Sequence, residues 1–248
     1  MRKVPLVDTD IIEFSTLQSP CVYIKDTKMQ MAYKYIKDCS LELSSKLVER
    51  GWRRFGHYYS RPACPNCKAC QSMRIDVNGF NFSKSVRRVI KKNEQTRVII
   101  QKPSITQKHL ALYEKYHRYM QEKKDWEYYP LTLESYADLY VKGFSSYGYE
   151  ILYIRDNKLI GVDLVDFLQD GLSAIYFYYD PDYAHLSLGK FSLYKQIEMA
   201  KKRTLAWIYL GYYVKECGSL SYKDEYKPNQ ILKNDPSIEE SAIWELHR

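Results

Sequence analysis

Residues 149–181 read YEILYIRDNKLIGVDLVDFLQDGLSAIYFYYDP, and three apolar segments alternate there with short polar breaks. The segments are 149–155, 159–167 and 172–179, separated by Asp156-Asn157-Lys158 and Gln169-Asp170-Gly171 and ended by Asp180-Pro181. Segments of this length that are rich in β-branched and aromatic residues are typical of strands, and Asn, Asp and Gly are typical of the turns between them. The stretch therefore predicts three consecutive strands.

The flanking segments extend this pattern in both directions. Residues 106–124, with Leu110, Tyr113, His117 and Met120 on one face, and residues 133–141 have helical spacing. A helix over 188–203 follows a capping Ser187, and residues 206–213 read as another strand. The order α, α, β, β, β, α, β is that of an N-acyltransferase-like (GNAT) core. We therefore expect an α+β fold with a GNAT-like acyltransferase core.

The start of the last helix, Ser187-Leu188-Gly189-Lys190, is a candidate phosphate site. Free backbone N–H groups and the positive end of the helix dipole favour an anion at such a terminus. Gly189 is its only glycine, whereas acetyltransferases use a glycine-rich loop for the pyrophosphate of coenzyme A. This difference favours an acyl carrier other than coenzyme A.

A change in character near Pro103-Ser104 predicts a domain boundary, with an N-terminal domain over 1–103 and a transferase domain over 104–248. Residues 1–20 read as an irregular lead-in, 29–35 as a strand or short helix, and 40–50 as a helix. Residues 51–59 and 74–77 are strand-like. Ser83 can cap a helix whose apolar stripe is Val86, Val89 and Ile90. The N-terminal domain is thus expected to be small, basic and rich in cysteine.

The positive charge is concentrated in that part. The chain has 38 Lys and Arg against 30 Asp and Glu, a formal charge of +8, and residues 1–100 hold 19 of the cations and 9 of the anions, hence +10. Such asymmetry predicts a polyanion as partner. Nucleic acid is favoured over lipid because no apolar run approaches the ~18 residues that a membrane span needs. No secretory apolar core follows Met1, so we expect a cytoplasmic protein without a membrane partner.

Three cysteines lie two residues apart in Cys64-Pro65-Asn66-Cys67-Lys68-Ala69-Cys70. Thiolates at this spacing can converge on one ion, and disulfides are disfavoured in the cytoplasm. Cys21 is the first candidate for a fourth ligand and His57 the second, and the donor set suits zinc or an iron–sulfur cluster. Reduced, metal-free thiols are the alternative. Cys39 and Cys217 read as ordinary buried thiols.

A series of segments stands in order between about residues 20 and 230: Cys21-Val22-Tyr23, Gly51-Trp52-Arg53-Arg54-Phe55-Gly56, Tyr59-Ser60-Arg61-Pro62-Ala63-Cys64, Arg87-Arg88, Asp170-Gly171-Leu172-Ser173-Ala174, Ser187-Leu188-Gly189, Tyr209-Leu210-Gly211-Tyr212 and Tyr222-Lys223 with Pro228. Together they resemble the aminoacyl-tRNA-protein transferases of the N-end rule pathway. The chain is most similar to the bacterial aspartate/glutamate leucyltransferase branch of that family. Ile24 stands where the eukaryotic relatives carry the second cysteine of C-x-Y-C, so their ligand set does not carry over intact.

The resemblance implies transfer of leucine from Leu-tRNA to the α-amine of proteins that begin with Asp or Glu, which marks them for degradation. It implies no cofactor for the transfer itself. The partners would be aminoacyl-tRNA and the acceptor proteins. Three alternatives stay open: an arginyl-tRNA-protein transferase, a non-catalytic zinc-containing RNA-binding protein, and an acetyltransferase that uses acetyl-coenzyme A.

The chemistry of this transfer nominates three groups of residues. Proton transfer needs a carboxylate or a tyrosine on the splayed strands, and a bidentate arginine suits the acceptor carboxylate. A basic helix suits the tRNA backbone. The candidates are Asp163, Asp166 and Tyr176 for proton transfer; Arg53, Arg54 and Arg74 for the acceptor; and Arg87, Arg88, Lys91, Lys92, Ser187, Gly189 and Lys190 for tRNA.

Overall fold

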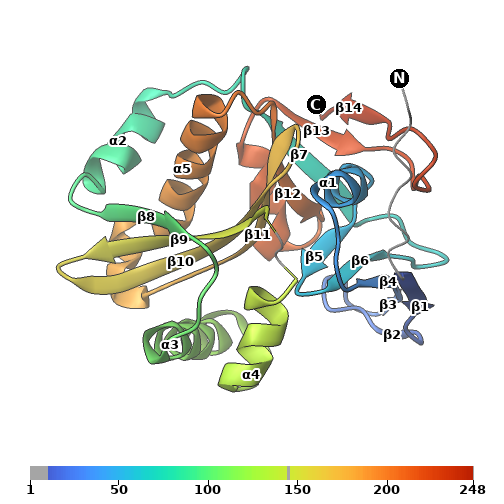
Figure 1. Cartoon of the computed structure of the whole chain (residues 1–248), viewed down its shortest axis with the longest axis horizontal. Coiled ribbons are helices and arrows are strands. Elements are labelled where there is room, and N and C mark those ends of the chain that lie inside the picture. Colours follow the sequence, from blue (N-terminus) through green and yellow to red (C-terminus); the bar gives the residue numbers. More distant parts are fainter. Residues whose placement is uncertain (1–10, 144–145, 248) are drawn as a thin grey trace.

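A computed structural model describes residues 11–143 and 146–247 of the chain, and within these residues the protein is a mixed α/β molecule built around one large sheet (Figure 1). The strands of this sheet are β7 (Gln71–Asp76), β8 (Arg97–Gln101), β9 (Gly148–Arg155), β10 (Lys158–Phe167), β11 (Gly171–Tyr179), β12 (Trp207–Tyr213), β13 (Asn229–Leu232) and β14 (Trp244–Leu246). Their order across the sheet is β14-β13-β7-β12-β11-β10-β9-β8. β11 and β12 run parallel, and the other neighbouring strands run antiparallel.

A smaller sheet lies beside the large one, with the order β1-β4-β6-β5, and β2 pairs with β3 (Figure 1). These strands are β1 (Ile11–Ser15), β2 (Ser19–Pro20), β3 (Lys28–Met29), β4 (Met31–Ile36), β5 (Arg53–Phe55) and β6 (Tyr58–Pro62). The helix α1 (Leu41–Glu49) joins the two sheets. Its Leu47 packs with Trp52 and Tyr59 of the small sheet, whereas its neighbour Val48 packs on Leu168 and Tyr209 of the large one.

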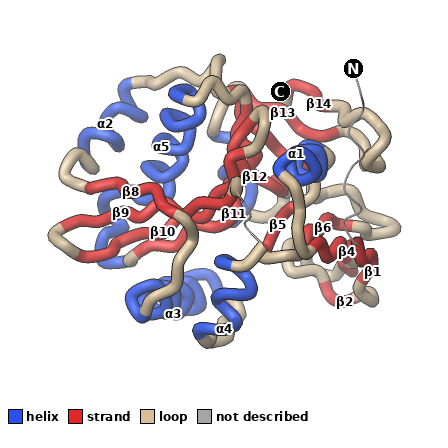
Figure 2. The backbone as a smooth tube through the Cα atoms, in the orientation of Figure 1, coloured by secondary structure: helices blue, strands red, loops and turns tan. Residues whose placement is uncertain are grey.

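The remaining helices cover both faces of the large sheet. They are α2 (Lys84–Lys92), α3 (Gln107–Lys124), α4 (Leu133–Tyr136), α5 (Leu188–Lys202) and α6 (Gly218–Ser221), with the π-helical turn η1 (Ala137–Val141) and the 3₁₀ turns η2 (Pro181–Leu186) and η3 (Tyr222–Glu225). Figure 2 shows α2 and α5 on one face of the sheet and α3 and α4 on the opposite face. Each face therefore has its own apolar core. Tyrosine rings dominate the core on the face that α3 and α4 cover.

The three strands predicted from residues 149–179 are confirmed as β9, β10 and β11, and the fourth as β12. The helices predicted over 40–50, 106–124 and 188–203 and after Ser83 are confirmed within one or two residues at each end. The capping role of Ser187 was wrong. Its backbone is left-handed (φ 56°) and its side chain makes no capping hydrogen bond. Leu110 is only partly buried, so the apolar face of α3 is centred nearer His109 and Leu112.

Other predictions of the N-terminal part need correction. Residues 11–15 and 19–20 of the expected lead-in form strands, and residues 1–10 lie outside the described part. Residues 51–59 form a hairpin of β5 and β6 rather than one strand. Strands β8, β13 and β14 were not predicted. The predicted boundary at residue 103 falls after β8, and β7 and β8 belong to the same large sheet as β9 to β14.

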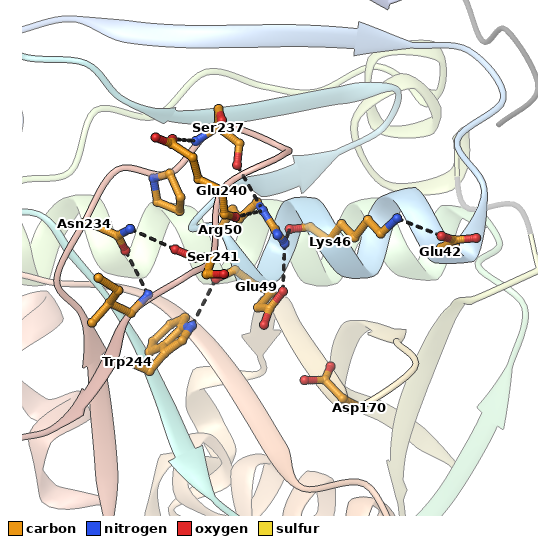
Figure 3. Close-up of polar contacts among 12 residues, drawn as sticks. Glu42, Lys46, Glu49, Arg50, Asp170, Asn234, Ser237, Glu240, Ser241 and Trp244 are labelled. Carbon is orange, nitrogen blue, oxygen red and sulfur yellow. Dashed lines mark hydrogen bonds and ion pairs between the residues drawn. The ribbon is translucent and has the colours of Figure 1, made fainter. Parts of the chain in front are cut away.

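The C-terminal segment returns to α1 and is fastened there (Figure 3). Arg50 Nε donates to the carbonyl oxygens of Ser237 (3.1 Å) and Glu240 (3.0 Å), and the indole N–H of Trp244 donates to the carbonyl oxygen of Glu49 (3.1 Å). The bond from Trp244 gives a partner to the Glu49 carbonyl at the C-terminal end of α1, where carbonyls lack partners within the helix, and the bonds from Arg50 bind two carbonyls of the C-terminal segment. None of the described helices is long and apolar enough to cross a membrane.

Candidate functional site

The parallel strands β11 and β12 pair at only three positions and then diverge. The register runs from Gly171↔Trp207 to Ser173↔Tyr209 and stops there. A β-bulge follows at once in each strand, with Ile175 as the extra residue of β11 and Leu210 as the extra residue of β12. Bulges bend a strand and leave backbone groups without ladder partners. The two bulges thus open a wedge in the middle of the sheet.

Arg53 of β5 lies in this wedge. Its Nη2 donates to the carbonyl oxygens of Ala174 (2.7 Å) and Ile175 (3.1 Å), which β12 no longer pairs. Its guanidinium also lies against Gly211 of β12, where a Cβ would fall 2.1 Å from Nη1. Gly211 has φ +73°, a conformation that suits glycine. Arg53 Nη1 is buried and has no hydrogen-bond partner within residues 11–143 and 146–247.

A second cation, Lys223, stands beside Arg53. Its side chain is buried, and Nζ donates to the carbonyl oxygen of Tyr212, the residue after Gly211. Burial, and then the charge of Arg53, lower the pKa of Lys223 to about 7. Burial also lowers the pKa of Arg53, against the opposing influence of the Tyr212 and Tyr23 hydroxyls. None of the ion pairs found among residues 11–143 and 146–247 involves either cation.

A cavity of about 360 Å³ has Tyr212 in its wall, the residue whose carbonyl oxygen accepts from Lys223, but neither Arg53 nor Lys223 lines it. Tyr23 and Tyr212, whose hydroxyls face Arg53, form part of its wall. Further along, the wall includes the basic residues Arg61 and Lys233. Tyr212 thus belongs both to the cavity wall and, through its carbonyl oxygen, to the contact with Lys223.

Arg54, the next residue along β5, does not face the wedge but forms an ion pair with Asp166. It forms a two-pronged ion pair with Asp166, with Nε–Oδ2 and Nη2–Oδ1 distances of 2.7 Å, and its Nη1 donates to the carbonyl oxygen of Gly56. The side chains are 3% and 0% exposed. The structure therefore brings together one predicted acceptor residue and one predicted proton-transfer residue, but it pairs them with each other.

Arg74, the third predicted acceptor residue, lies between two indole rings. Its guanidinium carbon is 3.7 Å from the ring centre of Trp207 and 4.3 Å from that of Trp244. Nε and Nη2 both donate to Oε1 of Gln230. The side chain thus links β7, β12 and β13 to the C-terminal segment, away from the wedge.

Asp163 is buried beneath α5. Its Oδ2 accepts hydrogen bonds from Ser192 Oγ (2.6 Å) and Gln196 Nε2 (2.7 Å), one helical turn apart. Burial raises the pKa of Asp163 to about 7, although these bonds partly oppose the rise. At 1% exposure the carboxyl group fastens α5 to β10 and does not reach the wedge from the solvent side.

Tyr176 follows the bulged Ile175 and is paired with His117 of α3. The hydroxyl lies 2.6 Å from His117 Nε2, and Nδ1 lies 2.7 Å from the carbonyl oxygen of Tyr113. Burial lowers the pKa of His117. A carbonyl oxygen only accepts, so in the neutral ring Nδ1 carries the proton and Nε2 accepts from Tyr176. The sequence placed His117 on an apolar face and gave no sign of this partnership.

The predicted tRNA residues lie on one side of the molecule. Arg87, Arg88, Lys91 and Lys92 are all exposed on α2, and a groove there also contains Arg155 from the end of β9. Asn93, after α2, donates to the carbonyl oxygen of Leu186, which brings α2 to the start of α5. At that start Gly189 faces open space, and Lys190 pairs with Glu225 of η3.

The four predicted metal ligands line one cavity, the one that has Tyr212 in its wall. Burial and the other thiols raise the pKa of Cys70 to about 12. However, the described residues contain no group of three or more His, Cys, Asp or Glu side chains arranged to hold a metal ion. The cysteine thiols therefore have the right chemistry but not the convergence of a metal centre, and His57 does not line the cavity.

Comparison with known proteins connects this geometry with a family. Residues 19–88 match the family model of the N terminus of arginine-tRNA-protein transferase, and residues 108–233 match that of its C terminus. The second match covers the wedge, α5 and η3, and the first covers Arg53 and the cysteines. The chain belongs to the arginine-tRNA-protein transferase family.

Relatives named aspartate/glutamate leucyltransferase align over most of the chain. The protein from Campylobacter jejuni is 52% identical over 94% of this chain and 98% of its own length. The one from Helicobacter hepaticus is 43% identical over 96% of this chain and 98% of its own length. The solved structure of L-PGS from Bacillus licheniformis covers 60% of this chain and 46% of that chain at 10% identity, with a TM-score of 0.40, too low to establish a shared fold.

Proposed function

We propose that this protein transfers leucine from Leu-tRNA to the α-amine of proteins that begin with Asp or Glu, in the cytoplasm, and so marks them for degradation. The observation that carries the proposal is the 52% identity, over 94% of the chain, to a relative named aspartate/glutamate leucyltransferase. The wedge between β11 and β12 supports it, because a GNAT-like core would receive the acyl group where two parallel strands diverge.

The donor ester is already activated, so the protein mainly has to position an uncharged amine against the ester carbonyl and stabilise the oxyanion. We assign the tRNA backbone to α2, through Arg87, Arg88, Lys91 and Lys92. The phosphate near the 3′ end is assigned to Ser187, Gly189 and Lys190 at the start of α5. The bond between Asn93 and Leu186 supports this division, because it holds the two basic regions side by side.

Of the three residues predicted for proton transfer, Tyr176 remains. Asp163 and Asp166 are buried and hydrogen-bonded within the fold. Tyr176 is partly buried, stands next to the wedge, and its hydroxyl is held by a neutral imidazole. We assign it to relay one proton: as the bond between the acyl carbon and the ribose oxygen breaks, the hydroxyl gives its proton to that oxygen and takes up the proton that the attacking α-amine loses.

We also propose that zinc or an iron–sulfur cluster binds four cysteines, Cys21, Cys64, Cys67 and Cys70. We assign this group no part in the transfer reaction. Metal analysis and an absorption spectrum of anaerobically purified protein test it, and neither zinc nor iron should be found if the thiols stay free.

The activity is tested by incubating the protein with labelled Leu-, Arg- and Phe-tRNA and with peptides that begin with Asp, Glu, Arg or Ala. Transfer of leucine to the Asp and Glu peptides alone supports the proposal. Transfer of arginine would instead identify an arginyltransferase. RNA binding without any transfer would support a non-catalytic RNA-binding protein, and turnover of acetyl-coenzyme A would support an acetyltransferase.

A further inference from the structure

Arg53 and Lys223 are two neighbouring cations, and neither has an acidic partner among the described residues. Arg53 uses Nη2 on the carbonyls of Ala174 and Ile175, and Lys223 uses Nζ on that of Tyr212. Arg53 Nη1 is buried without any hydrogen bond. The contrast with Arg54 is instructive, because Arg54 is buried one residue away and has both oxygens of Asp166.

Burial of a cation without an anion is unfavourable, and the cost is largest when a donor is also left without an acceptor. Two such cations side by side raise that cost further. The fold nevertheless imposes this arrangement, since Gly211 has no side chain and its backbone brings β12 against the guanidinium of Arg53. An anion bound between Arg53 and Lys223 would remove this unfavourable energy. The pair is therefore suited to bind one.

We propose that Arg53 and Lys223 form the subsite for the side-chain carboxylate of the acceptor's N-terminal Asp or Glu. This inference rests on the proposed function and assigns the acceptor specificity to two named residues. Arg53 contributes the N–H of Nη1, which no group among the described residues accepts. Lys223 contributes a second cationic donor, held beside β12 by its bond to the carbonyl oxygen of Tyr212.

The position of the pair supports a carboxylate on the acceptor rather than a phosphate of the tRNA. The basic residues assigned to tRNA are exposed on α2 and at the start of α5, whereas Arg53 Nη1 and Lys223 are buried. A cavity of about 360 Å³ lies nearby, with Tyr23 and Tyr212 in its wall, and the acceptor carboxylate would pass Tyr212 to reach the pair. A compact carboxylate can enter such a site, but a phosphodiester backbone cannot follow it.

The test is competition between two peptides, identical except that one begins with Asp and the other with the uncharged isostere Asn. Both compete in one tube for Leu-tRNA and the full-length protein, and the products give the ratio of their kcat/KM values. This ratio does not depend on the fraction of protein that is folded, so a poorly folding variant still gives an answer. The variants are Arg53→Lys, Arg53→Gln, Lys223→Gln and, as a control on the exposed surface, Lys215→Gln.

The wild type and Lys215→Gln should share a strong preference for Asp. Lys223→Gln should reduce the Asp:Asn ratio by about 30-fold or more, and Arg53→Gln by about 100-fold or more, within the range seen when one partner of a buried charge pair is removed. The loss should appear in the KM of the Asp peptide, and Arg53→Lys should restore part of it. Unchanged ratios in both variants would overturn the subsite. Absence of leucine transfer by the wild type would instead overturn the proposed function.

Discussion

Arg54 and Asp166 lie on different sheets, 112 residues apart in sequence, and are joined by two hydrogen bonds of 2.7 Å. Both side chains are almost fully buried, and burial is outweighed by the carboxylate, which raises the pKa of Arg54 above its usual value. The pair holds the hairpin β5–β6 against the large sheet. It thereby fixes the place from which the neighbouring Arg53 enters the wedge.

Removing one member of this pair should destabilise the protein strongly. Arg54→Met leaves the Asp166 carboxylate buried without a partner, and we expect a loss of about 3–5 kcal/mol in the free energy of unfolding. Urea denaturation measures it. Lys46→Met, which breaks an exposed pair with Glu42, is the control and should cost less than about 0.5 kcal/mol. A similar small loss for Arg54→Met would contradict the structural role.

Asp163→Asn should keep its activity and change the dependence of stability on pH. The folded-state pKa of about 7 lies above that of an unfolded aspartate, so the wild type loses stability as pH rises from about 4 to 7. Asn has no such titration. The stability of the variant relative to wild type should therefore increase by about 1–3 kcal/mol between pH 5 and pH 8. A drop in transfer of several hundred-fold would restore Asp163 as a catalytic candidate.

Tyr176→Phe should lower kcat by about 100-fold or more, because the proton donor for the leaving oxygen is removed. KM for both substrates should change little. Tyr178→Phe is the matched control: this tyrosine shares the strand and the aromatic cluster, and its hydroxyl lies 2.6 Å from that of Tyr136. Equal effects of the two changes would show that Tyr176 acts only through packing.

Gly211→Ala should weaken transfer to acidic N-termini. The new methyl group would stand 2.1 Å from Arg53 Nη1, and φ +73° is unfavourable for alanine. Arg53 must then leave the wedge. The Asp:Asn ratio of the competition assay should fall, while tRNA affinity measured by filter binding is unchanged. Gly218→Ala, where the added atom meets nothing within 4 Å, serves as the comparison.

The double change Arg87→Ala, Arg88→Ala should weaken tRNA binding without altering acceptor preference. Both side chains are exposed on α2. If each contacts a phosphate, the slope of log K against log salt concentration should become shallower by about 1 per lost contact. Unchanged affinity at low salt would remove α2 from the tRNA surface.

The sequence was informative wherever local chemistry decides the outcome. Alternating apolar segments with Asp-Asn and Asp-Gly turns predicted β9, β10 and β11, and the stripe of Val86, Val89 and Ile90 predicted α2. The sequence could not assign roles to Arg53, Arg54 and Arg74, because their side-chain contacts are made with residues that are distant in sequence. Arg54 meets Asp166, Arg74 meets Trp207 and Trp244, and Arg53 meets the opened strands.

One local signal for the site was present. A glycine inside an apolar strand often marks a bulge or a close approach of another group, and Gly211 marks both. Lys223 carried no such signal. Its burial depends on α6 and η3 folding back onto β12, which local spacing does not reveal.

The position of β7 in the large sheet has a consequence for synthesis of the protein. Asp76 of β7 pairs with Trp207, 131 residues later, and Ile75 pairs with both Ile208 and Asn229. While the chain emerges from the ribosome, β7 has neither of its neighbouring strands, because β12 and β13 are synthesised more than 130 residues later. Non-local pairing of this kind is slow and leaves nascent chains prone to aggregation. Chaperone supply during translation should therefore govern the yield of active protein more than its final stability does.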